Sequence, residues 1–171
     1  YQKEPVNIIW FAKGNGELVG MTHYPDQKVY GWHRHTIAGT DPAVESISTI
    51  PSPDGQRDDL WMIVKRTING STKRYIEYMS RHYEDDMEVY EGARCDSRFS
   101  YIGSSTSTVT GLSHLEGQTV KVMVDGKSHP DLAVSGGAIT LANSRVGENI
   151  QIGLGYRWRL VTREVEIKLK N

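Results

Sequence analysis

Two histidines one residue apart are the most chemically suggestive feature of the chain: His33 and His35, in the stretch GWHRHT (31–36). On a β-strand their side chains point to the same face, about 7 Å apart along the chain. Two imidazoles in this arrangement can supply two ligands to a transition metal. A third ligand would have to come from elsewhere, with His23, Asp26 and Glu45 as candidates. The alternative is that Trp32 packs inward and the imidazoles line a wet or subunit-facing side.

A second cluster mixes aromatic and basic side chains near the C-terminus, in GYRWRLVTR (155–163). Tyr156, Arg157, Trp158 and Arg159 could stack on nucleotides or sugars. They could equally form a strand with aromatic residues inward and arginines outward. The arginines could also line a channel for DNA, since contact with the phosphate backbone needs positive charge but no reading of bases.

Other candidate sites have simpler interpretations. The pairs Asp58-Asp59 and Asp85-Asp86 are adjacent in sequence, whereas a glycosidase needs carboxylates that face each other across a cleft. The glycine-rich stretch SGGA (135–138) precedes a strand rather than a helix, so we predict a turn and no phosphate-binding loop. Cys95 is the single cysteine, so no internal disulfide and no Cys-x-x-Cys metal site can form. No established catalytic motif is present. We therefore predict a protein that is not an enzyme and that uses no cofactor or metal.

The bulk composition indicates a soluble globular chain and excludes several classes. The 171 residues have a net charge of -1, so no basic excess points to nucleic-acid binding. No apolar run approaches the ~20 residues that span a bilayer, and no signal-peptide pattern appears.

Hydrophobic residues alternate with period two along most of the chain, which predicts an all-β fold with little helix. Asn69-Gly70 joins two strand-like runs, as in a type I′ hairpin, and Asp125-Gly126 makes a second tight turn. Residues 80–98 are charged and break the alternation, so we expect a connector with at most a short helix. Pro130 indicates an edge strand or a bend.

We expect two small antiparallel β modules, at 1–90 and 91–171. The first reads as a meander or propeller-blade-like sheet of four or five strands, and the second as a small barrel or sandwich. In the strand at 60–68, Leu60, Met62 and Val64 should face one side. In the strand at 43–50, Val44, Ser46 and Ser48 should share one face.

The order of these motifs resembles a family of phage proteins. VYGWHRHTIAG, VESISTIPSPDGQRDDLWMIVKRTINGSTKRYIEYM and GLSHLEGQTVKVMVDGKSHPDLAVSGGAITL are similar to segments of the nozzle, or tail tubular protein B, of short-tailed bacteriophages and of their prophage relatives. The similarity runs from about residue 10 to residue 160. Family members are several times longer, so we expect this chain to be an internal piece.

The resemblance implies a structural role in the virion, made in the bacterial cytoplasm. Such proteins form a ring below the portal and adaptor and build the tube through which DNA is ejected. The expected partners are other copies of the chain, other tail and adaptor proteins, and exiting DNA through non-specific contact. Under this interpretation Trp32 is a core residue, and His33 and His35 lie at the surface or between subunits. The alternative is a carbohydrate- or receptor-binding module of a phage tail, with Trp10, Trp61, Tyr75, Tyr156 and Trp158 as stacking residues.

Overall fold

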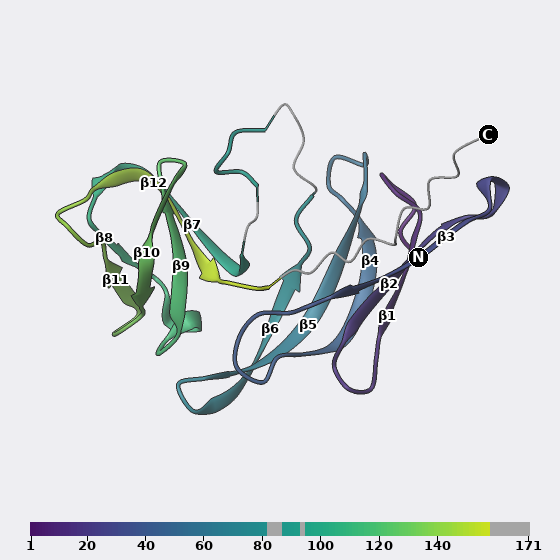
Figure 1. Ribbon diagram of the computed structural model, residues 1–171, viewed down its shortest axis with the longest axis horizontal. Helices are drawn as coiled ribbons and strands as arrows, with labels where there is room; N and C mark the ends of the chain where they lie inside the picture. Colours follow the sequence, from purple (N-terminus) through teal and green to yellow (C-terminus); the bar gives the residue numbers. More distant parts are fainter. Residues whose placement is uncertain (82–86, 93–94, 158–171) are drawn as a thin grey trace, which may run out of the picture.

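The computed structural model describes residues 1–81, 87–92 and 95–157, and this part of the chain is almost entirely β-structure (Figure 1). Its strands form four small antiparallel sheets. The two helical elements within the described residues are single 3-10 turns at Pro25–Gln27 and Ser113–Leu115. The prediction of an all-β fold with little helix is confirmed.

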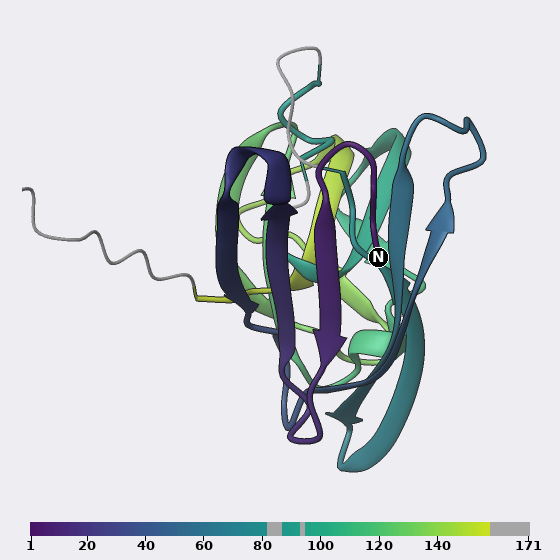
Figure 2. The ribbon, with the colours of Figure 1, turned by 90° about the vertical axis from the view of Figure 1, so that its right-hand side faces the viewer.

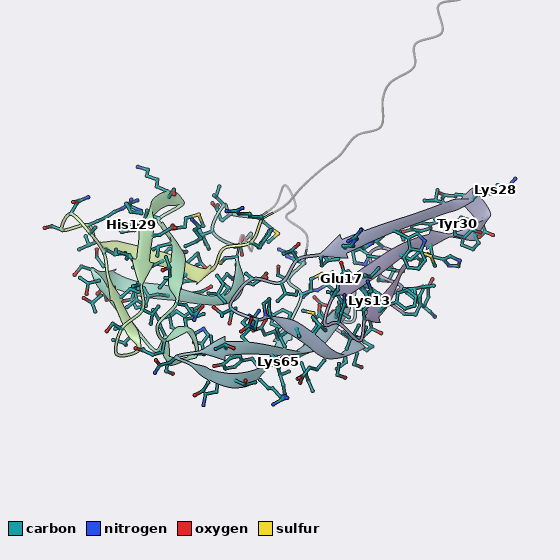
Figure 3. All side chains as sticks on the ribbon, turned by 60° about the horizontal axis from the view of Figure 1, so that its bottom comes forward. Lys13, Glu17, Lys28, Tyr30, Lys65 and His129 are labelled. Carbon is teal, nitrogen blue, oxygen red and sulfur yellow. The ribbon has the colours of Figure 1, made fainter. Side chains whose placement is uncertain are left out.

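The first sheet has the order β1-β2-β3, with strands at Ile8–Ala12, Leu18–Tyr24 and Val29–His35. Its glycine-rich first turn is closed by hydrogen bonds between Lys13 and Glu17 and from the Gly16 amide to the Lys13 carbonyl. The β2–β3 hairpin reaches away from the rest of the molecule, with Lys28 and Tyr30 at its far end (Figure 3).

The second sheet has the order β4-β5-β6, with strands at Ala43–Pro51, Asp58–Ile68 and Ser71–Tyr78. The Asn69-Gly70 turn joins β5 to β6 as predicted, and both residues have positive φ, at 47° and 69°. The predicted facing of Leu60, Met62 and Val64 is also confirmed, since all three are buried.

The predicted facing of β4 is wrong because the strand contains a bulge. The register shifts between Val44 and Ser46, so the alternation slips by one residue. Val44 is buried, Ser46 and Ser48 are exposed, and Ile47 packs against the same hydrophobic cluster as Val44.

The two three-stranded sheets pack their inner faces around one hydrophobic cluster, so the predicted meander is divided into two layers (Figure 2). The layers are joined beside β1 and β4, where the Val44 amide donates to the Gly16 carbonyl over 2.9 Å. Burial of each large side chain in the cluster contributes about 1.5–3 kcal/mol. Its buried members are Ile8, Trp10, Leu18, Val44, Leu60, Met62 and Val64.

The C-terminal part contains a four-stranded sheet, β10-β9-β12-β7, and a two-stranded sheet, β11-β8. The larger sheet comprises β7 (Asp96–Thr106), β9 (Thr119–Val124), β10 (Lys127–Ala133) and β12 (Gly147–Leu154). The smaller comprises β8 (Thr108–Thr110) and β11 (Ala138–Thr140). These sheets enclose a second cluster and do not close into a barrel. Val120, Val122, Val124, Ile150 and Ile152 are buried in it.

Pro130 and the connector at 80–98 are two places where the regular strand alternation is interrupted. Pro130 lies in the edge strand β10, whose register shifts between His129 and Leu132, so both the edge and the bend occur. The described residues of 80–98 contain no helix, and β7 already begins at Asp96. The residues of the connector at 82–86 and 93–94 lie outside the described chain.

Candidate functional site

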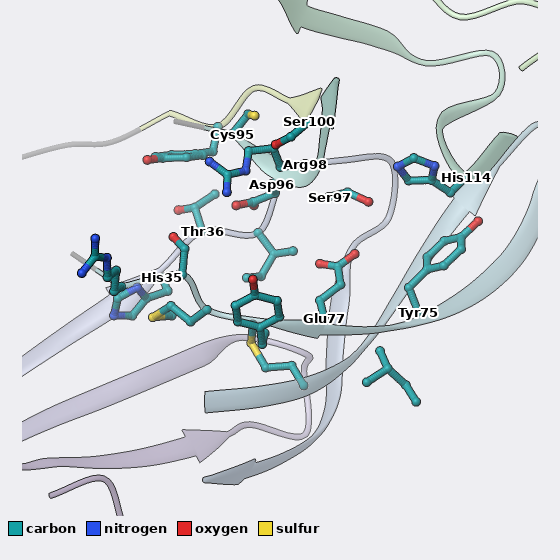
Figure 4. Close-up of a pocket in the computed structure, with 18 of the residues that line it drawn as sticks. His35, Thr36, Tyr75, Glu77, Cys95, Asp96, Ser97, Arg98, Ser100 and His114 are labelled. Carbon is teal, nitrogen blue, oxygen red and sulfur yellow. The ribbon is translucent and has the colours of Figure 1, made fainter. Parts of the chain in front are cut away.

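A cleft of ≈ 1230 Å³ lies between the ends of β3 and β6 on one side and the start of β7 on the other (Figure 4). His35, Glu77, Asp96 and Arg98 line it, together with Tyr75 and His114 at one end. The cleft thus brings together charged groups from strands that are far apart in sequence. None of these carboxylates was predicted as a site residue.

Glu77, which lines this cleft, forms an ion pair with Arg66. Arg66 is buried, with 1% of its surface exposed, on the inner face of β5. Its two terminal nitrogens donate to the two carboxylate oxygens of Glu77 on β6, one of them over 3.0 Å. This bidentate geometry satisfies the buried guanidinium and occupies both oxygens of Glu77. The position of Arg66 carried a signal in the sequence, since it has the same strand parity as Leu60, Met62 and Val64.

Ala38 links this ion pair to the C-terminal part of the molecule. Its carbonyl accepts from Arg66 Nε over 2.8 Å, and its amide donates to Asp96 Oδ2 over 2.7 Å. Its side chain is buried in the cluster of the C-terminal sheets. We call this arrangement of Ala38, Arg66, Glu77 and Asp96 the clasp.

Gly39 allows the chain to pass closely over Arg66 within the clasp. Its φ of +117° is a conformation that L side chains rarely adopt. A Cβ at this position would lie 2.8 Å from Arg66 Cδ and 3.3 Å from Leu154 Cδ1. The glycine is therefore required by both backbone conformation and space.

Burial raises the pKa of the Asp96 carboxyl, while the Ala38 amide and the charge of Arg66 lower it and the charge of Glu77 raises it. A carboxyl with a raised pKa can serve in acid–base catalysis. Here, however, Arg66 engages both oxygens of Glu77, and the Ala38 amide engages Asp96. These contacts join two parts of the fold.

His33 and His35 do come together, on the inner face of β3. His33 Nδ1 and His35 Nε2 are 2.7 Å apart, so one ring donates a hydrogen bond to the other. Both rings contact Trp10, with centroid distances of 5.6 and 5.0 Å. Gly20, opposite His33 on β2, leaves room for the imidazole, because a Cβ there would overlap the ring.

The prediction that Trp32 packs inward is wrong. Trp32 is 65% exposed on the outer face of the sheet, and its ring lies 5.7 Å from that of Phe11. The half-buried imidazoles occupy the inner face instead, where desolvation lowers the pKa of His33. Gly20 explains why the histidines and not Trp32 face inward, because the inner face has space for an imidazole beside this glycine.

None of the proposed third metal ligands joins the histidine pair. The His23 ring lies 5.4 Å from that of Tyr30, and Asp26 sits in the exposed 3-10 turn at the hairpin end. Glu45 accepts two hydrogen bonds from Arg74, over 2.7 and 3.1 Å, on the other sheet. Across residues 1–81, 87–92 and 95–157, no group of three or more His, Cys, Asp or Glu side chains could hold a metal ion.

The C-terminal cluster is described in part. Arg157 lines the same cleft as His35, beside Tyr156, which is 42% exposed beyond the end of β12. Trp158 and Arg159 lie outside the described residues.

The remaining sequence candidates have structural partners. The Lys3 amide donates to Asp58 over 2.7 Å, and Arg57 pairs with Asp59 over 2.9 Å. The Ser-Gly-Gly stretch forms the predicted turn, and the amides of Gly136 and Gly137 donate to Glu116 over 3.0 and 2.7 Å. Asp85 and Asp86 lie outside the described residues.

Comparison of the chain with protein-family models and with curated proteins found no match. Within the part of the chain that the structure describes, no helix is long and apolar enough to cross a membrane.

Proposed function

We propose that the chain is a structural component of the tail of a bacteriophage or prophage, part of the tube or nozzle through which DNA is ejected. In this role it belongs to the virion, is made in the bacterial cytoplasm, and contacts further copies of itself and other tail or adaptor proteins. The order of the sequence motifs suggests the family. One structural observation carries the structural role, namely two apolar sheet faces turned to solvent.

The first of these faces is the outer side of β1-β2-β3, here called face A. Trp32, Tyr30 and Phe11 are 65%, 57% and 40% exposed on it. The half-buried Ile9, Val19 and Met21 lie beside them on the neighbouring strands.

The second is the outer side of β4-β5-β6, here called face B. Ile76, Tyr78 and Ile63 are 75%, 53% and 38% exposed, and the Trp61 ring lies 5.2 Å from that of Tyr78. Contiguous apolar patches of this kind generally mark surfaces that bind protein. A chain with two of them suits an assembly better than a free monomer.

The polar groups of the clasp support the same proposal, because they have structural partners.

The arginines at the cleft add a route for non-specific DNA contact in the assembled tube. Arg34, Arg98 and Arg157 line it, against the carboxylates of Glu77 and Asp96. Contact of this type needs backbone phosphates alone.

The test is an in-frame deletion of the segment from the phage or prophage genome that encodes it. We expect particles with incomplete tails that fail to eject DNA. His33→Ala and His35→Ala serve as point variants, which should retain plating, because the described residues bring no third metal-ligating side chain to the pair. Normal tails and normal ejection from the deleted particles would refute the proposal.

A carbohydrate- or receptor-binding module of a phage tail is the second candidate, favoured by the exposure of Trp32. Of the aromatic residues predicted to stack on sugars, Trp10 is buried, whereas Tyr156 is exposed. A glycan array with the chain and its Trp32→Ala variant tests this function. Binding that is lost in the variant would support it, and no binding to any glycan would remove it.

A further inference from the structure

We propose that Asn69 is a site of spontaneous deamidation, at which the side-chain amide is lost as ammonia and the turn between β5 and β6 gains a carboxylate. Two Asn-Gly pairs occur in the chain, Asn15-Gly16 and Asn69-Gly70, and their surroundings differ. This modification does not depend on the tail function proposed above, because it involves only the reactivity of one turn.

The reaction needs only these two residues and water. The backbone nitrogen of Gly70 loses its proton to hydroxide and attacks Cγ of Asn69. The new N–Cγ bond closes a cyclic imide, while the Cγ–Nδ2 bond breaks and Nδ2 takes up a proton to leave as ammonia. Water then opens the ring at either carbonyl and gives aspartate or isoaspartate, so no oxidant or reductant takes part. Glycine favours the attack because it has no side chain to obstruct it.

Both reacting groups are accessible in the β5–β6 turn (Figure 1). Asn69 and Gly70 are exposed, and within the described residues neither the Asn69 side chain nor the Gly70 amide makes a hydrogen bond. The strand ladder ends at the pair of Ile68 and Ser71. The attacking nitrogen and the carbon that it attacks are therefore not held by other contacts.

The tip of this hairpin can rearrange without disturbing a hydrophobic cluster. The attack requires the backbone at Asn69 to rotate out of its native turn conformation, in which φ is 47°. Nothing lies within 4 Å of the Cβ position of Gly70, and residues 71–73 at the start of β6 are exposed. Segments with few packing contacts open locally at little cost in free energy.

The same dipeptide is held by hydrogen bonds in the β1–β2 turn. The Gly16 amide donates to the Lys13 carbonyl over 2.8 Å, and Asn15 Oδ1 accepts from the Glu17 amide over 3.2 Å. Asn15 is exposed, as Asn69 is, so access to water does not distinguish the two sites. The difference lies in the contacts of the reacting groups.

Packing against β4 also opposes opening of the β1–β2 turn. The Gly16 carbonyl accepts from the Val44 amide over 2.9 Å, and a Cβ on Gly16 would overlap the side chain of Ala43. The attack at Asn15 would require these contacts to break. We therefore expect folding to slow deamidation at Asn15 much more than at Asn69.

The Asp125-Gly126 turn shows that a hairpin of this shape does not by itself leave its first side chain unbound. Its φ values of 49° and 73° match the 47° and 69° of Asn69-Gly70. Asp125 Oδ1 nevertheless accepts from the amides of Glu148 and Asn149, over 3.1 and 2.9 Å. The exposure of the Asn69 amide is thus a property of its surroundings and not of the turn type.

Conversion of Asn69 should weaken the β5–β6 hairpin. Isoaspartate adds one carbon to the main chain, whereas a two-residue turn of this kind matches its strands through a specific backbone geometry. The turn also lies against the C-terminal part of the molecule. Gln118 Nε2 donates to the Thr67 carbonyl over 3.5 Å, and the Cβ position of Gly117 lies 4.0 Å from Asn69 Cα. We therefore expect the converted chain to melt at a lower temperature.

The test incubates the full chain in mildly alkaline buffer, once folded and once unfolded in urea. Peptide mapping by mass spectrometry follows the conversion at Asn69 and at Asn15 separately. Asn69→Gly and Asn15→Gly are the matched variants, because each removes one reactive amide and glycine adopts turn conformations readily. Ion-exchange chromatography of the intact protein then measures the acidic form that each variant produces.

We expect Asn69 to convert several times faster than Asn15 in the folded chain, and the two sites to convert at similar rates in urea. Asn69→Gly should lose most of the acidic form, and Asn15→Gly should keep it. Equal rates at the two sites in the folded chain, or conversion of Asn69 in urea alone, would overturn the assignment. A converted chain that melts at the same temperature as the fresh one would overturn the effect on the hairpin.

Discussion

The replacement Gly39→Ala tests whether the clasp joins the two parts of the fold. The φ of +117° costs an alanine about 1–3 kcal/mol. The new Cβ would also lie 2.8 Å from Arg66 Cδ, in a packed environment where overlap costs about 1–3 kcal/mol. We expect the free energy of unfolding to fall by about 2–6 kcal/mol.

Gly55→Ala is the matched control, because Gly55 also has a positive φ, +68°, but nothing lies within 4 Å of its Cβ position. This variant should lose about 1–2 kcal/mol from the backbone conformation alone. The difference between the two variants therefore measures the contacts with Arg66 and Leu154 together with any extra backbone cost of the φ of +117°.

Urea unfolding, followed by circular dichroism and tryptophan fluorescence, gives both free energies. We expect Gly39→Ala to unfold at the lower urea concentration. Equal losses in the two variants would refute the reasoning, since the passage of the chain over Arg66 would then contribute nothing.

Three further predictions concern single residues. Gly70→Val should lower the free energy of unfolding by roughly 1–3 kcal/mol, because a β-branched residue resists the φ of 69° in the turn; an unchanged melting temperature would contradict this. Asp96→Asn should raise the melting temperature at neutral pH. Burial raises the pKa of Asp96, so its ionised form destabilises the fold once the pH rises above the ordinary pKa of an aspartate. That gain in melting temperature should vanish in acid. A gain that instead grows in acid would contradict the reasoning, because it would mean that folding lowers the pKa of Asp96. The lowered pKa of His33 predicts a loss of stability as pH falls below about 6.5, and His33→Gln should reduce this loss; identical pH profiles would exclude His33 as the cause.

Much of the strand pattern was predictable because hydrogen bonding in sheets and turns leaves local signals. The Asn69-Gly70 and Asp125-Gly126 hairpins form as their residue types require, and Pro130 lies on an edge. The bulge in β4 was not predictable, because Glu45 gives no local sign that it interrupts the alternation.

The candidate sites were harder to predict because they depend on contacts distant in sequence. Ala38 and Asp96 are separated by 58 residues, and no motif indicates that one binds the other. The orientation of β3 was also ambiguous, because Trp32 and the two histidines fit either face by polarity. Gly20 on the neighbouring strand decides it by leaving space for His33.

Faces A and B are visible in the sequence once the register is known, since Trp32, Trp61 and Ile76 occupy outward positions. The apolar character of both sides is explained if further protein covers the outer one.

The mass of the unaltered chain in solution, measured over a range of concentrations, tests the central claim most directly. We predict species larger than one chain, and we expect their share of the protein to increase with concentration, since both faces remain available. A single-chain mass at every concentration would contradict the account, because two exposed apolar faces would then have no copy of the chain to cover them.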